Sequence, residues 1–199
     1  MKYLFNVLFK FIAYFDRYLS GLFLRLKRKY VIHYYAVLYP TRLNLKKDLL
    51  IGKNFKILFD NSKSLVIIGQ GVYLRDYVTI RSEKNSKIVI GDRVFFNSFC
   101  SIAALEEISI GNDCSFGENV KIFDSNHIYK DPTQLITEQG FSTGKIRIGD
   151  NCWIGSNVTI LKNLEIGDHV VIGAGCTIYK SLPPNTLVIN NQSLITKPL

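Results

Sequence analysis

The fold is decided by residues 148–183, which read IGDNCW, IGSNVT, ILKNLE, IGDHVV, IGAGCT and IYKSLP when cut every six residues. Each block begins with isoleucine, and a small or apolar residue follows four positions later. Upstream, the frame continues through three more trios of leading residues: Ile68, Leu74 and Ile80; Ile90, Phe96 and Ile102; and Ile110, Phe116 and Ile122. Glycine stands directly after the leading residue at positions 69, 91, 111, 117, 149, 155, 167 and 173. A fixed period of six indicates a repeat architecture, whereas a sandwich of antiparallel strands would alternate with a period of two.

A six-residue unit accommodates one short strand and a turn, so three units predict a triangular coil of about 18 residues. Glycine, asparagine and aspartate suit the corners because they tolerate positive φ. The trios that begin at residues 68, 90, 110, 148 and 166 predict about five coils stacked around one apolar column. A weaker start at Ile51 and Ile57 predicts a cap. We therefore expect a mainly β protein.

The cysteines follow the same frame. All four stand four positions after a leading residue, at Cys100, Cys114, Cys152 and Cys176. Their spacing contains no Cys-x-x-Cys pair of the kind found in zinc sites. We expect small apolar core residues in a reducing compartment, and neither nucleophiles nor metal ligands.

The repeat is interrupted once. After Ile122 the next leading residue is Ile148, which predicts a long loop extruded near residues 126–147. A loop of this length in so regular a scaffold is typically functional. At its start, residues 123–132 read FDSNHIYKDP and contain His127, with Asp124 and Asp131 nearby.

The residues alone leave three interpretations of His127: a general base, a metal ligand or a loop histidine without a role. Imidazole titrates near neutrality and suits proton transfer. A catalytic zinc site needs three converging protein ligands, and the other two histidines, His33 and His169, are far away in the sequence. We therefore expect no metal.

The first 50 residues differ from the rest in charge. They hold ten Lys and Arg against two acidic residues, a net +8, whereas residues 51–199 hold 15 against 14, a net +1. Residues 1–30 predict an amphipathic helix with a wide apolar face and a basic end at residues 25–29. Such a helix suits an anionic membrane surface, although it could instead pack on the protein or on a neighbouring subunit.

This composition also bears on domains and location. We expect a basic helical segment over residues 1–50, a β-helix over 51–187 and a tail over 188–199. The helical segment lacks the ~20-residue apolar run of a membrane span and the core of a signal peptide. We therefore expect a cytoplasmic protein, or one bound peripherally at the inner face of the cytoplasmic membrane. The net positive charge is concentrated in a hydrophobic segment, so we expect no nucleic-acid partner.

FDSNHIYKDP, the loop, IRIGDNCWIGSNVTI and IGAGCTIYKSLP together resemble the hexapeptide-repeat acyltransferases, in particular the sugar and capsular-polysaccharide O-acetyltransferases. The resemblance covers about residues 65–187. It implies a left-handed parallel β-helix and an acetyl-CoA-dependent O-acetyltransferase that modifies a bacterial surface polysaccharide or its precursor. It also implies a homotrimer with active sites between neighbouring subunits.

The resemblance assigns roles to individual residues. It implies that His127 is the catalytic base and that the backbone N–H of Ser156 stabilises the oxyanion, while Asp124 or Asp131 could support His127. The residues implied in binding coenzyme A are Trp153, Gly155, Ser156, Gly173, Ala174, Tyr179 and Lys180. Those implied in binding the acceptor are Asn97 and Trp153.

Two departures from the family pattern leave alternatives open. Ala104 and Leu105 replace an acidic pair of the sugar enzymes, and VINNQSLITKPL lacks the usual Gly-x-Pro-Ala turn after the last coil. One alternative is N-acetylation of an amino sugar. Another is a non-catalytic hexapeptide scaffold, which should lack the base or the coenzyme edge.

Overall fold

The computed structural model describes residues 22, 26, 28–60 and 63–191 of the chain. The chain forms two compact units, Met1–Tyr39 and Pro40–Leu199. In the first unit, residues 22, 26 and 28–38 are helical. Within the described part of the chain, no helix combines the length and hydropathy needed to cross a membrane.

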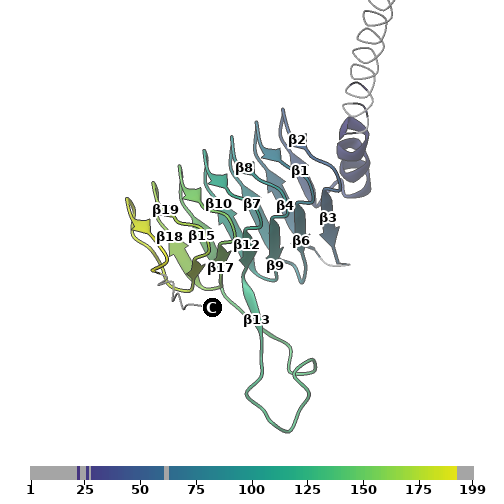
Figure 1. Ribbon diagram of the computed structural model, residues 1–199. Coiled ribbons are helices and arrows are strands. Elements are labelled where there is room, and N and C mark those ends of the chain that lie inside the picture. Colours follow the sequence, from purple (N-terminus) through teal and green to yellow (C-terminus); the bar gives the residue numbers. More distant parts are fainter. Residues whose placement is uncertain (1–21, 23–25, 27, 61–62, 192–199) are drawn as a thin grey trace, which may run out of the picture. The chain divides into compact units, whose positions relative to one another are not determined.

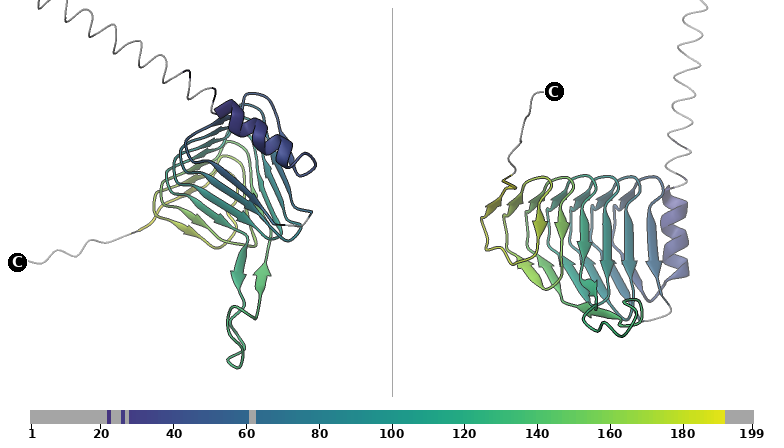
Figure 2. Two further views of the ribbon diagram at one scale, coloured as in Figure 1. Left: turned by 90° about the vertical axis from the view of Figure 1, so that its right-hand side faces the viewer. Right: turned by 60° about the horizontal axis from the view of Figure 1, so that its bottom comes forward.

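The second unit is a parallel β-helix with three faces, each formed by one sheet (Figures 1 and 2). Sheet 1 contains β1 (Leu43–Leu45), β4 (Leu65–Ile68), β7 (Lys87–Ile90), β10 (Glu107–Ile110), β15 (Ile146–Ile148) and β18 (Leu164–Ile166). Sheet 2 contains β2 (Leu50–Ile51), β5 (Tyr73–Leu74), β8 (Phe95–Phe96), β11 (Ser115–Phe116), β16 (Trp153–Ile154), β19 (Val171–Ile172) and β21 (Leu187–Val188). Sheet 3 contains β3 (Lys56–Phe59), β6 (Thr79–Ser82), β9 (Ser101–Ala104), β12 (Lys121–Phe123), β17 (Thr159–Ile160) and β20 (Thr177–Ile178). We name the corners between these faces the 1–2, 2–3 and 3–1 edges.

The predicted β-helix is confirmed, and a left-handed winding is consistent with it. Three successive strands make one coil, and β1–β3 form a complete coil in register with β4–β6. The structure therefore has about six coils rather than five, and the predicted cap belongs to a full first coil. The predicted domain boundary at residue 50 falls inside β2. Strand pairing already begins at Leu43 in β1, so the first coil starts before that boundary.

The leading residues form the core. Each of them, from Ile68 to Ile178, is at most 4% exposed, and the rings of Phe96 and Phe116 stack with centroids 4.2 Å apart. Full burial of such a side chain contributes about 1.5–3 kcal/mol. The cysteines are buried and free, as predicted. Burial raises the pKa of the Cys100 thiol to about 11, which keeps this thiol neutral and unreactive at neutral pH.

The glycines that follow the leading residues have a different role from the predicted one. A Cβ on Gly91 would collide with the backbone of Gly111 in the next coil, and one on Gly111 would collide with Gly149. Glycine is therefore needed here for close stacking of coils. Positive φ falls instead three residues after the leading residue, for example at Asn151 and Asn157. The explanation from positive φ was wrong for these glycines.

The interruption of the repeat is an antiparallel hairpin that projects from the coils (Figure 2). Its strands are β13 (Ser125–His127) and β14 (Phe141–Thr143), with His127 opposite Phe141. The excursion runs from residue 124, after β12, to residue 145, before β15. It therefore begins and ends two residues earlier than the predicted loop.

Candidate active site

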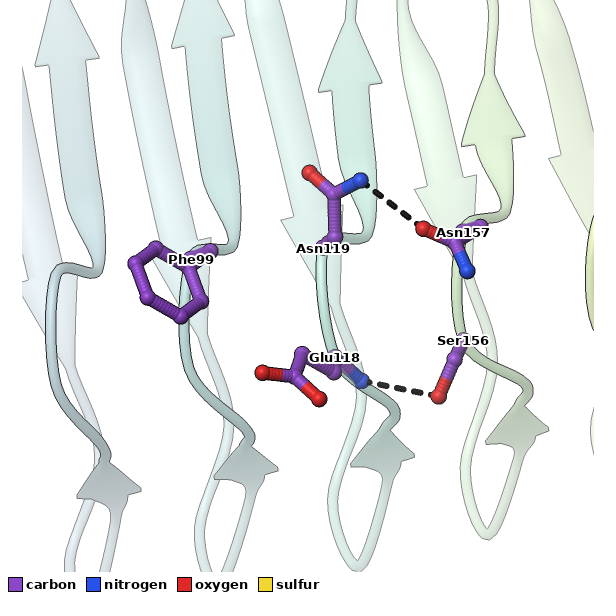
Figure 3. Close-up of a pocket in the computed structure, with 5 residues that line it drawn as sticks. All are labelled: Phe99, Glu118, Asn119, Ser156 and Asn157. Carbon is purple, nitrogen blue, oxygen red and sulfur yellow. Dashed lines mark hydrogen bonds between the residues drawn. The ribbon is translucent and has the colours of Figure 1, made fainter.

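An open pocket of about 420 Å³ lies at the 2–3 edge (Figure 3). It is lined by Phe99, Glu118, Asn119, Ser156 and Asn157, which come from three successive coils. The Glu118 N–H donates to Ser156 Oγ at 3.1 Å, and Asn119 Nδ2 donates to Asn157 Oδ1 at 2.8 Å. These contacts hold the polar groups of neighbouring coils at fixed positions around the pocket.

The backbone N–H of Ser156 donates to no acceptor among the described residues. At the 1–2 edge, the amide two residues after the leading residue donates to a side chain in the next coil, as Asp150 does to Asp168 at 2.7 Å. The residue that takes this place above Ser156 is Ala174, whose side chain offers no acceptor. The edge therefore keeps a fixed N–H donor available for a ligand.

Small residues surround this amide. A Cβ on Gly155 would collide with the Ala174 amide, so glycine permits the close stacking of these two coils. Gly173 and Ala174 continue the edge with little side-chain bulk. Trp153 is exposed in β16, one strand residue before this corner. The edge is therefore a strip of small side chains beside an exposed aromatic ring.

Asn97 lies at the same edge, directly after β8 and two coils away from Ser156, which follows β16. Its Oδ1 accepts hydrogen bonds from Arg75 Nη1 at 3.2 Å and from the Ser98 N–H at 2.8 Å. Arg75, Phe99 and Glu118 were missed from the sequence. They occupy the first, second or third place after a leading residue, so the hexapeptide frame that located Ser156 could have found them.

His127 lies elsewhere, in the hairpin at the 3–1 edge. Its ring is exposed and lies 4.3 Å from that of Phe141, measured between centroids. Lys84 Nζ lies 4.7 Å from the centroid of the same Phe141 ring, which adds a cation–π contact. Tyr179 and Lys180 follow β20 at this edge, and both are exposed.

Neither candidate carboxylate hydrogen-bonds to His127 within the described residues. Asp124 is fully buried at the base of the hairpin, where it accepts from the N–H groups of Leu105 and Glu106, each at 2.8 Å. Burial raises the pKa of Asp124. Hydrogen bonds from the hydroxyl and N–H of Thr133 lower the pKa of Asp131. Asp124 thus anchors the hairpin, and Asp131 orders its loop.

The single chain brings the predicted residues together in two groups. Asn97, Gly155, Ser156, Gly173 and Ala174 lie at the 2–3 edge, with Trp153 beside them; His127, Asp124, Tyr179 and Lys180 lie at the 3–1 edge. Ser156 precedes β17, which pairs with β12, whereas His127 lies beyond the far end of β12. A full face of the β-helix separates the two groups.

The described residues contain no group of three or more His, Cys, Asp or Glu side chains placed to hold a metal ion.

Comparison with known proteins identifies the family. Residues 145–180 match the model of the bacterial transferase hexapeptide (six repeats). Nodulation protein L of Rhizobium meliloti is 33% identical over 129 residues, which cover 64% of this chain and 68% of the relative. This chain belongs to the hexapeptide-repeat transferase family. The predicted family is therefore confirmed.

Other members and structures are similar to this hexapeptide-repeat chain. The putative lipopolysaccharide biosynthesis O-acetyl transferase WbbJ of Escherichia coli is 32% identical, over 55% of this chain and 60% of the relative. A mutant of AntD, an N-acyltransferase from Bacillus cereus in complex with dTDP and coenzyme A, has a TM-score of 0.65 and 19% identity, with 79% of this chain and 83% of that chain covered. This likeness establishes the fold. The chain spans only 37% to 68% of the lengths of these and other curated relatives that it matches.

Proposed function

We propose that this protein is an acetyl-CoA-dependent O-acetyltransferase that modifies a hydroxyl of a bacterial surface polysaccharide or its precursor. The observation that carries the proposal is the Ser156 N–H, which is left without an acceptor among the described residues, on an edge of small residues. A rigid donor of this kind suits the oxyanion of acyl transfer. The relatives named as acetyltransferases support the same reaction.

In the proposed reaction, a ring nitrogen of His127 accepts the proton of the acceptor hydroxyl. The hydroxyl oxygen then forms a bond to the carbonyl carbon of the acetyl thioester, and the Ser156 N–H donates to the carbonyl oxygen as it gains negative charge. The carbon–sulfur bond breaks, and His127 returns its proton to the departing thiolate of coenzyme A. The buried cysteines need not form an acyl-enzyme.

The co-substrate would lie along Gly155, Gly173 and Ala174, with Trp153 beside the pantetheine arm. Lys180 would attract the phosphates of the nucleotide, and Tyr179 would contact the coenzyme nearby. Asn97 and Trp153 would contact the acceptor. The small side chains along the edge fit this arrangement, because a larger one at Gly155 would collide with the next coil.

A homotrimer would complete the site. His127 and Ser156 lie at different edges of one chain, so a direct transfer needs the 3–1 edge of one subunit to face the 2–3 edge of another. A closed ring of three identical contacts satisfies this requirement for each subunit. The separation of the two groups supports this assembly, since neither group alone holds both the base and the oxyanion donor.

The test is release of free thiol from acetyl-CoA with a panel of acceptors, some carrying hydroxyl groups only and some carrying an amino sugar. His127→Asn should lower the rate at least ~10²-fold and leave binding of coenzyme A, measured by calorimetry, unchanged. His169→Asn is the matched control, because His169 is an exposed histidine at the 1–2 edge that contacts Asn151. It should retain the wild-type rate.

Other outcomes would contradict parts of the proposal. Turnover only with amino acceptors would indicate N-acetylation. Full turnover by His127→Asn would require another base. If the wild type does not bind coenzyme A, the hypothesis of a non-catalytic scaffold protein replaces the hypothesis of an acetyltransferase.

A further inference from the structure

The helical segment of the first unit has an exposed apolar stripe. Leu22, Leu26, Tyr30, Tyr34 and Val37 are each between 44% and 68% exposed. Steps of three and four residues place them along one side of a helix. Tyr30, Tyr34 and Val37 belong to the continuous helix of residues 28–38, which is about 16 Å long.

The other side of the helix is less accessible. Arg28, Val31, Ile32 and Tyr35 are half-buried, and helical spacing places them on the side opposite the stripe. The apolar stripe is therefore the more exposed side of the helix. A contiguous exposed apolar surface of this kind marks an interaction site.

Charge indicates what covers it. The stripe overlaps the basic stretch Arg25–Lys29, which holds four cations, and Lys29 is itself exposed. Residues 1–50 carry a net +8. Interfacial helices combine an apolar side with Lys and Arg in the same way, and each cation near an anionic membrane surface adds about 1 kcal/mol of attraction.

We propose that the stripe formed by Leu22, Leu26, Tyr30, Tyr34 and Val37 binds the surface of an anionic membrane, with the helix lying along the surface. The predicted membrane segment, residues 1–30, lies largely outside the described residues, and the stripe shifts the contact toward residues 22–37. A second copy of this chain fits less well, because a symmetric pairing of two stripes would bring two basic stretches together. The proposal is independent of the acetyl-transfer reaction.

The test is sedimentation of the full-length protein with phosphatidylcholine vesicles, with and without phosphatidylglycerol. The wild type should bind only the anionic vesicles, and added salt should weaken binding. Leu26→Glu and Tyr34→Glu should each lower the partition coefficient about tenfold or more, because each places an anion in the apolar stripe. Leu187→Glu is the matched control: Leu187 is similarly exposed but belongs to β21. It should bind like the wild type.

Circular dichroism and the oligomer mass of each variant complete the test. Absence of wild-type binding to anionic vesicles at low salt would overturn the proposal. An equal loss of binding in Leu187→Glu would show that added negative charge, and not the stripe, controls binding. If the wild type does not bind anionic vesicles and Leu26→Glu lowers the oligomer mass, a second copy of the chain covers the stripe instead.

Discussion

The 1–2 and 2–3 edges have the same turn geometry but differ in how many of their backbone N–H groups donate hydrogen bonds to side chains of the next coil. At the 1–2 edge, an unbroken series of amide-to-side-chain hydrogen bonds of 2.6–2.9 Å joins five coils, through Gln70, Asp92, Asn112, Asp150 and Asp168. At the 2–3 edge, such bonds between coils form from Lys53 to Asp76 and from Glu118 to Ser156. The N–H groups of Asp76 and Ser156 themselves have no acceptor among the described residues. The comparison teaches that a site can arise in a repeat along an edge where side-chain acceptors are missing.

Restoring an acceptor at the 2–3 edge should have the largest effect. In Ala174→Asp, the new carboxylate should accept from the Ser156 N–H, as Asp168 does from Asp150. The donor would then be unavailable to the oxyanion, so we expect kcat to fall about 10²- to 10³-fold. The midpoint of thermal unfolding should not fall. Rates and unfolding midpoints measured on the same preparation separate the two effects.

The reciprocal change at the 1–2 edge is its control. Asp168→Ala removes the acceptor of the Asp150 N–H and should cost about 0.5–1.5 kcal/mol of stability without lowering kcat. If Asp168→Ala lowers kcat as much as Ala174→Asp, the two edges do not differ in function.

Close stacking at the 1–2 edge can be tested at Gly149. A Cβ at this position would collide with Asp168 and with the Gly167 backbone, so Gly149→Ala should lower the free energy of unfolding by about 2–3 kcal/mol. Chemical denaturation measures this change. Gly140→Ala in the hairpin is the comparison, because a Cβ added there would meet no atom within 4 Å, which leaves only the cost of positive φ, about 1–2 kcal/mol. A larger loss at Gly140 would contradict the stacking argument.

The 3–1 edge offers a smaller, pH-dependent effect at Asp124. Asp124→Asn keeps one acceptor oxygen for the Leu105 and Glu106 amides, and we expect it to cost about 1–2 kcal/mol near neutral pH. Burial raises the pKa of Asp124, so the folded protein holds this proton to higher pH than the unfolded chain. This contribution is full below the unfolded-state pKa of about 3.9 and is lost as pH rises through the folded-state pKa.

The stability difference between wild type and Asp124→Asn should therefore shrink as pH rises across that interval. Denaturant unfolding at several pH values measures the difference. A difference that grows with pH would indicate that hydrogen bonds to the ionised carboxylate outweigh its burial.

Much of the fold could be predicted because the repeat is local. The leading residues, the buried cysteines and the position of the hairpin all follow from the period of six, and the hairpin was displaced by only two residues. The first coil was predicted only as a cap because its sequence, from Leu43 to Phe59, repeats weakly. The site was predicted residue by residue from resemblance, and the roles of His127 and Ser156 stay predictions.

By itself, the sequence determined the coil period, the apolar column and the basic apolar segment that precedes it. Only the tertiary structure decided that the Ser156 N–H is left without an acceptor among the described residues and that His127 lies at another edge. The physical reason is the sequence separation of the interacting groups. The hydrophobic pattern repeats every six residues, whereas these amides donate to side chains in a neighbouring coil, 18 residues away for Asp150 and 38 for Glu118. Which polar groups remain for a substrate depends on that stacking.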